Sequence, residues 1–197
     1  MSLESMGPRR VLDDPAAMRA FAHPVRLALH ELLMRAGPAT AADAAREVGV
    51  SQALASYHLR QLARYGFVEQ AEARDERERP WKVTTHVQQW SSDAWSAEAS
   101  AARGLLEQVI AERALTWLAE WQRRRQDEPD EWREAGHVGN TYLYATVEEL
   151  RDVGETLMGL LEPLMARALD PSSRPEGARP VLLAQMLLPL PPAGSDD

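Results

Sequence analysis

Two short helical patterns joined by a glycine constrain the fold of this chain more than any other feature of its sequence. Thr40 is an N-cap residue for a helix over Ala41–Val48, and Gly49 permits the left-handed backbone that a sharp turn needs. Ser51 then caps a second, longer helix that we expect to run to about Tyr65. Two helices this close in sequence pack across each other, and the pattern therefore predicts a helix-turn-helix.

The second of these helices has two chemically different faces. Small and aliphatic side chains recur at helical spacing on the face that we expect to pack inward, namely Val50, Ala55, Leu59 and Leu62. Most side chains on the opposite face can form hydrogen bonds with base edges or phosphates. The helix and its cap therefore predict DNA contacts by Ser51, Gln52, Ala53, Ser56, Tyr57 and Arg60.

The segments on either side complete a domain over residues 13–85. Asp13 or Asp14 can cap a helix with Pro15 in its first turn, and Pro24 begins the next helix. Residues 67–71 and 81–85 have the composition of two short strands, and the charged segment 72–80 joins them as a loop. Four helices, of which the last two form the helix-turn-helix, followed by a hairpin make a winged helix-turn-helix.

The loop of this hairpin carries cations that suit contact with the DNA backbone. We predict phosphate contacts by Arg74, Arg77, Arg79 and Lys82. The same loop contains Glu72, Asp75, Glu76 and Glu78. The alternative, a self-neutralised and solvated loop, therefore remains open at this point.

The net charge of −8 lies in the second half of the chain. Residues 13–85 contain as many acidic as basic side chains, whereas residues 86–197 contain ten arginines and nineteen acidic residues, for a net charge of −9. Charge alone neither supports nor excludes a nucleic-acid partner, because the acidity lies away from the proposed DNA face.

Several functional classes are disfavoured by composition. The absence of cysteine excludes a disulfide framework, a zinc-thiolate site and a cysteine nucleophile, and it favours a cytoplasmic protein. No segment approaches the roughly 18 consecutive apolar residues of a membrane helix, and residues 1–10 do not resemble a signal peptide. No catalytic motif, cofactor motif or metal-ligand spacing is present, so we expect neither an enzyme nor a metal site. Residues 1–12 and 191–197 are expected to be disordered tails.

The second half, residues 86–190, predicts a long helix and a small α/β region. The helix spans 96–125 and is the expected dimer interface, with an intramolecular cover for its own region as the alternative. We expect strands over 141–146 and 181–188, and a helix over 147–169 that Pro163 kinks or ends early. The expected fold class is therefore mainly α (α+β).

Aromatic residues of this second half form a candidate pocket for a small-molecule effector. Trp117 and Trp121 share one helix face, and Tyr142 and Tyr144 share one face of the predicted strand. Aromatic residues at such spacings also build ordinary cores, and the sequence does not distinguish these two interpretations.

The first half resembles the ArsR-like (arsenic-repressor) family of bacterial winged-helix regulators. The resemblance rests on Ala22-His23-Pro24-Val25-Arg26-Leu27, Val50-Ser51-Gln52, Ser56-Tyr57-His58-Leu59-Arg60-Gln61-Leu62 and Gly66-Phe67-Val68. It implies a homodimer that binds double-stranded DNA, represses transcription by occluding an operator, and is released by a ligand or a change of state. Metal-sensing members have a Cys-x-Cys motif in the helix before the recognition helix, whereas Ala41–Val48 has no cysteine, so a heavy-metal sensor is not expected. The alternative is a winged-helix interaction module whose acidic second half binds another protein.

Overall fold

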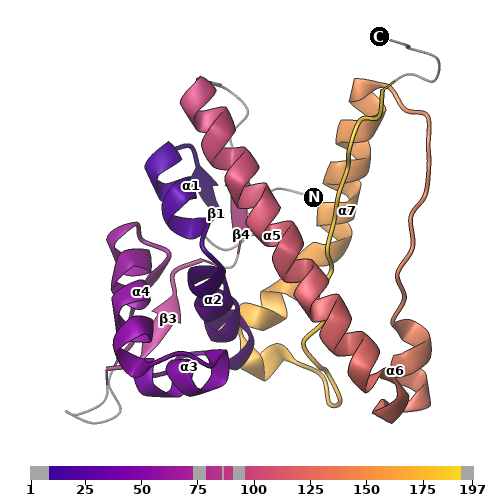
Figure 1. The fold of residues 1–197 in the computed structure, drawn as a ribbon. Helices are drawn as coiled ribbons and strands as arrows, with labels where there is room; N and C mark the ends of the chain where they lie inside the picture. The colour runs from indigo at the N-terminus through magenta and orange to yellow at the C-terminus, as the bar shows by residue number, and fades with distance from the viewer. Residues whose placement is uncertain (1–8, 73–78, 86, 91–95, 192–197) are drawn as a thin grey trace.

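The structure, a computed structural model, describes residues 9–72, 79–85, 87–90 and 96–191 (Figure 1). The elements of the first half are β1 (Arg9–Leu12), α1 (Pro15–Phe21), α2 (Pro24–Ala36), α3 (Ala41–Val48), α4 (Gln52–Arg64), β2 (Val68–Gln70), β3 (Trp81–Val83) and β4 (Val87–Trp90). The elements of the second half are α5 (Ala97–Arg124), η2 (Arg125–Asp127), α6 (Asp130–Ala135), α7 (Val147–Leu169) and η3 (Pro171–Ser173). The chain is therefore α+β and mostly helical, as the sequence predicts.

The helices of the first half begin at the caps that the sequence predicts. The backbone N–H of Ala16 donates to the Asp14 carboxylate at 2.8 Å, which selects Asp14 over its neighbour as the cap of α1. Thr40 caps α3 and Ser51 caps α4, each by accepting a backbone N–H three residues later at 3.2 Å. Gly49 ends α3 with a φ of 76°, a conformation that glycine adopts without the steric penalty of a side chain.

The wing is a short antiparallel hairpin of β2 and β3. Val68 lies opposite Val83, and Gln70 lies opposite Trp81. Ala39 extends this pairing, because it exchanges two backbone hydrogen bonds with Trp81 at 3.0 and 2.8 Å. The wing is thereby attached to the segment that leads into α3.

A second pair of strands corrects the prediction for the N-terminal tail. β1 pairs in parallel with β4, so that Arg9 lies opposite Val87 and Leu12 lies opposite Trp90. Leu12 is buried in the core. The expectation of disorder over residues 1–12 is therefore wrong for the last four of them, because their ladder partners lie far along the chain and leave no local signal.

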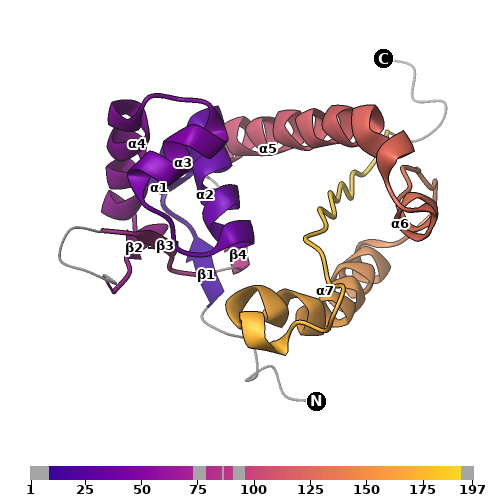
Figure 2. The same ribbon diagram turned by 90° about the horizontal axis from the view of Figure 1, so that it is seen from below.

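One core holds the first half together and extends under α5. Phe21 stacks on Phe67, with ring centroids 4.5 Å apart, where α1 meets the residues that follow α4. α5 covers this core along its first half and runs beyond it (Figures 1 and 2). The fully buried side chains include Leu12, Leu29, Leu33, Leu59, Leu62, Phe67 and Leu106.

The C-terminal region differs from the prediction of a small α/β unit. Residues 141–146 and 181–188 form no strand in the structure, although their side chains alternate as a strand would. A strand needs hydrogen bonds from a neighbour, and neither segment has a strand partner among the described residues. In segment 181–188, Leu187 instead lies next to Gly154 of α7.

Helix α7 continues through Pro163 to Leu169, so of the two predicted effects of Pro163, a kink or an early end, the early end does not occur. Thr146 caps its start in a capping box, in which Thr146 and Glu149 exchange hydrogen bonds with each other's backbone N–H. Near the opposite end of the region, Arg179 donates to both carboxylate oxygens of Glu128, at 2.8 and 3.2 Å, and joins the last segment to the turn after α5.

Candidate nucleic-acid interface

Helices α3 and α4 pack closely because their facing residues are small. Ala44 and Ala45 of α3 are buried, as is Ala55 of α4. Leu59 and Leu62 continue the inward face of α4 into the core, without measurable exposure. This packing fixes which face of α4 points to solvent.

The outward face of α4 is available to a partner in the single chain. Ser51, Gln52, Ala53 and Arg60 are exposed, and Ser56 is half-buried. Tyr57 is 49% exposed. The structure therefore brings together, on one helix and its cap, the six residues that the sequence predicts as its DNA contacts.

The charge of α4 is positive although the domain as a whole is neutral. The helix carries Arg60 and Arg64 and no acidic residue. Within the described part of the chain, neither arginine forms an ion pair with a carboxylate. Both cations are thus free to approach an anion.

The wing contributes less cationic surface than its sequence suggests. Lys82 pairs with Glu69 across the hairpin at 3.2 Å, which offsets part of its charge. Arg79 is exposed. The predicted contacts at Arg74 and Arg77 lie outside the described residues.

A cluster of side chains that no local sequence pattern reveals surrounds His58. His58, buried on α4, lies against His23 at the start of α2, with ring centroids 4.5 Å apart. Nδ1 of His23 accepts the backbone N–H of Val25 at 3.1 Å and so caps α2. Nδ1 of His58 and Nε of Arg26 are buried and, among the described residues, have no hydrogen-bond partner.

The electrostatics of this cluster disfavour protonated imidazoles. Burial lowers the pKa of His58, and the charges of His23 and Arg26 lower it further. Burial, followed by the charge of Arg26, lowers the pKa of His23. The pKa of Arg26 is itself lowered by burial, although the guanidinium keeps its charge at physiological pH.

Contacts between α2 and α5 orient one of the predicted pocket residues. Glu31 accepts from Nε of Arg113 at 2.7 Å and from the indole N–H of Trp117 at 3.1 Å. The Arg35 guanidinium also lies over the Trp117 ring, 4.8 Å from its centroid. Trp117 therefore connects α5 to the helix-turn-helix domain.

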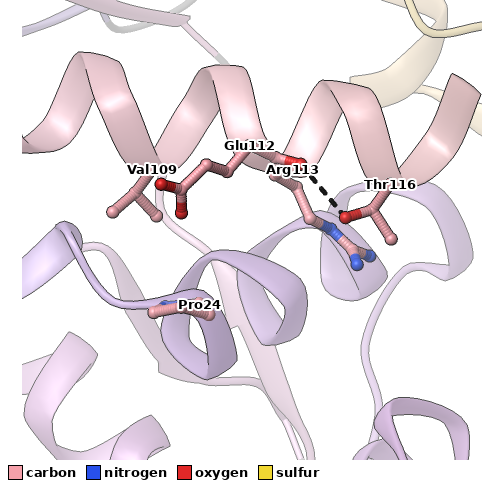
Figure 3. Close-up of a pocket in the computed structure, with 5 residues that line it drawn as sticks. All are labelled: Pro24, Val109, Glu112, Arg113 and Thr116. Carbon is pink, nitrogen blue, oxygen red and sulfur yellow. Dashed lines mark hydrogen bonds between the residues drawn. The ribbon is translucent and has the colours of Figure 1, made fainter.

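A shallow cavity of about 160 Å³ lies beside this connection, between the start of α2 and α5 (Figure 3). Its lining residues are Pro24, Val109, Glu112, Arg113 and Thr116. The Thr116 hydroxyl donates to the backbone carbonyl of Glu112 at 3.0 Å. None of the four aromatic residues predicted for an effector pocket belongs to this lining.

The four predicted pocket aromatics are in different environments. The Trp121 ring is covered by the Arg125 guanidinium, 4.6 Å from its centroid, and lies against Gly136. Tyr142 and Tyr144 project into solvent from the extended segment before α7. Side chains this exposed line no enclosed cavity in the single chain, and an aromatic effector pocket stays a prediction.

Two further observations bear on alternative functions. The described residues include no group of three or more His, Asp or Glu side chains placed to hold a metal ion. None of the described helices combines the length and apolar composition that a membrane span requires.

The geometry of the first half defines a winged helix-turn-helix domain with an exposed, cationic recognition helix. A family model described as a helix-turn-helix domain matches residues 21–71, from the end of α1 into the wing. A search of curated proteins finds no match.

Two solved structures of ZitR from Lactococcus lactis are among those similar to this chain. A point mutant matches at 18% identity, over 74% of this chain and 73% of that chain, with a TM-score of 0.29. The wild type in complex with DNA matches at 16% identity, over 74% of each chain, with a TM-score of 0.28. At these values, the domain assignment rests on the family match and on the geometry of α3 and α4.

Proposed function

We propose that this protein is a sequence-specific DNA-binding transcription regulator, a homodimeric repressor of ArsR-like type. The observation that carries the proposal is the outward face of α4. It presents Gln52, Ser56, Tyr57 and Arg60 on a helix without acidic residues. Hydrogen-bonding side chains beside unpaired cations are what a recognition helix needs to enter a major groove.

The test is binding to double-stranded DNA, using duplexes from the region upstream of its own gene and duplexes selected by the protein from a random pool. Arg60→Ala is expected to weaken binding to the best duplex about tenfold, since a good base contact contributes roughly 1–3 kcal/mol. Arg133→Ala, in α6 and away from α4, is the matched control and should bind as the wild type does. If the wild-type protein binds all duplexes equally or none, the proposal is wrong.

Dimerisation is supported by an apolar stripe on α7 that the single chain leaves partly exposed. The stripe recurs at helical spacing through Leu150, Val153, Leu157, Leu160, Leu161 and Leu164. No described side chain of α7 is buried. On α5, Leu105 and Leu115 are also exposed. We infer that a second copy covers this surface, because uncovered apolar stripes of this length mark interaction sites.

A dimer would act as a repressor by occupying an operator with two recognition helices, one in each half-site. Its release by a small molecule would require a change that reaches α4. The contacts of Glu31 with Arg113 and Trp117 provide a direct route from α5 to α2. Reporter transcription from the selected duplex should fall when the protein is present, and a rise would instead indicate an activator.

The second candidate is an interaction module whose second half binds a different protein. The exposed apolar stripe on α7 favours this candidate as much as it favours a dimer. The two differ in solution, because a module of this kind would be monomeric and would bind no selected duplex. Sedimentation velocity on the purified protein distinguishes them.

A further inference from the structure

We infer that His23, Arg26 and His58 form a phosphate-binding pocket that binds the DNA backbone beside helix α4. The pocket rests on the proposed DNA-binding function and adds residues that do not lie on the outward face of α4. Three cationic or protonatable side chains meet here, from the start of α2 and the middle of α4. The two imidazole rings are 4.5 Å apart.

Polar atoms of this pocket lack the partners that a purely structural cluster would supply. Nε of Arg26 and Nδ1 of His58 are buried without a hydrogen-bond partner among the described residues. Buried polar atoms are nearly always satisfied, and an unsatisfied pair calls for an explanation such as an absent ligand. The one described hydrogen bond of the Arg26 guanidinium is a long one, 3.4 Å from Nη2 to the carbonyl of Arg19.

The charge of the pocket selects an anion. No described carboxylate forms an ion pair with Arg26. The groups that face the imidazoles are Arg26 from α2 and, edge-on to His58, the Tyr57 ring with its centroid 5.2 Å away. Tyr65, after α4, also acts on Arg26. An oxyanion with several acceptor oxygens would satisfy Arg26 and His58 together.

The position of the pocket favours DNA phosphate as that anion. Tyr57 belongs to the proposed DNA face and touches the pocket through His58. His23 and Arg26 are half-buried, so their outer atoms are accessible from solvent, and a small movement of these side chains would open Nε of Arg26 and Nδ1 of His58 to a ligand. When a recognition helix lies in a major groove, the phosphates at the groove edge lie along its flank.

This arrangement couples DNA binding to protons. In the free protein, burial and the charge of Arg26 keep the imidazoles neutral near pH 7. A bound phosphate places negative charge beside them and favours imidazolium, which takes up a proton from solvent. Binding should therefore strengthen as the pH falls from 8 to 6, as long as the domain stays folded.

The test measures anisotropy of a labelled selected duplex between about 50 and 200 mM salt, and at pH 6 and 8, with circular dichroism to confirm folding. Arg26→Gln should weaken binding about tenfold on all duplexes alike and reduce the slope of log K against log salt by about one. Arg26→Lys should restore that slope, because it restores the charge. Arg133→Gln, the same charge change in α6, should leave both quantities unchanged.

Wild-type binding should be about tenfold tighter at pH 6 than at pH 8, which corresponds to an average uptake of about half a proton over this range, and His58→Gln should remove this difference. If Arg26→Gln has the affinity and salt slope of Arg133→Gln, the pocket is refuted while DNA binding stands. If the wild type binds no duplex, both the pocket and the proposed function are refuted. If His58→Gln fails to fold, the salt slopes of Arg26→Gln and Arg26→Lys test the pocket instead.

Discussion

The two halves of this molecule use apolar side chains in opposite ways. In the winged domain, Leu59 and Leu62 of α4 have no measurable exposure and pack against α2 and the wing. In α7, a leucine stripe of similar spacing has no fully buried member among the described residues, and Leu160 is 68% exposed. The difference teaches that helical spacing identifies an apolar face but not what covers it, whether the same chain or another.

The largest expected effect separates buried from exposed leucines. Leu59→Ala should lower the free energy of unfolding of the winged domain by about 2–5 kcal/mol, because it leaves a cavity in a closed core. Leu160→Ala should change the free energy of unfolding of the winged domain by no more than about 0.5 kcal/mol. Urea denaturation followed by tryptophan fluorescence and circular dichroism measures both. Equal losses would show that the two halves share one core.

The next prediction asks whether a second copy covers α7. Leu160→Glu should raise the dissociation constant of the dimer about tenfold or more, since it buries a charge in an apolar interface. Ala166→Glu introduces the same charge on the opposite, exposed face of α7 and serves as the control. Sedimentation equilibrium over a range of protein concentrations gives the constants. A dimer that tolerates both variants alike would place the interface elsewhere.

A third prediction compares equivalent helix caps. Ser51→Ala removes the cap of α4 and should cost about 1 kcal/mol in the unfolding of the winged domain. Thr146→Ala removes the capping box of α7 and should leave that transition in place while it reduces helical ellipticity. Thermal unfolding followed by circular dichroism measures the melting temperature and the helical ellipticity of both variants. A lower melting temperature of the winged domain in Thr146→Ala would show that α7 stabilises it.

The smallest effect concerns pH and is confined to the winged domain. The pKa of His23 and the pKa of His58 are lowered by burial and by Arg26, so the unfolded chain binds more protons than the folded one below the ordinary histidine pKa. Stability should therefore fall as the pH decreases from about 7 to 5.5. His58→Gln should flatten this dependence in urea titrations at several pH values. An unchanged profile would show that the cluster does not control the acid sensitivity.

Much of the winged domain could be predicted because its signals are local. The caps at Thr40 and Ser51 act within one helical turn, and Gly49 ends α3 through its own backbone conformation. Inward and outward residues of α4 follow from a period of 3.6 residues once one face is known to be buried. The outward set of α4 was therefore available from sequence, although its binding to DNA stays a prediction.

Other features depend on residues that are distant in sequence. The pairing of β1 with β4 joins residues almost eighty positions apart, and no local pattern distinguishes Arg9–Leu12 from a tail. The alternation in residues 141–146 and 181–188 resembles that of strands, yet no described neighbour supplies the hydrogen bonds. The contact of Trp117 with Glu31 likewise joins α5 to α2 across the fold.

The sequence by itself determined where the helices of the winged domain begin and which face of α4 is outward, because caps, glycine turns and helical periodicity act over a few residues. Only the tertiary structure decided that His23, Arg26 and His58 meet, since the start of α2 and the middle of α4 come together through packing. Only the tertiary structure showed that the stripe on α7 stays partly exposed within the chain, because burial depends on which surfaces meet.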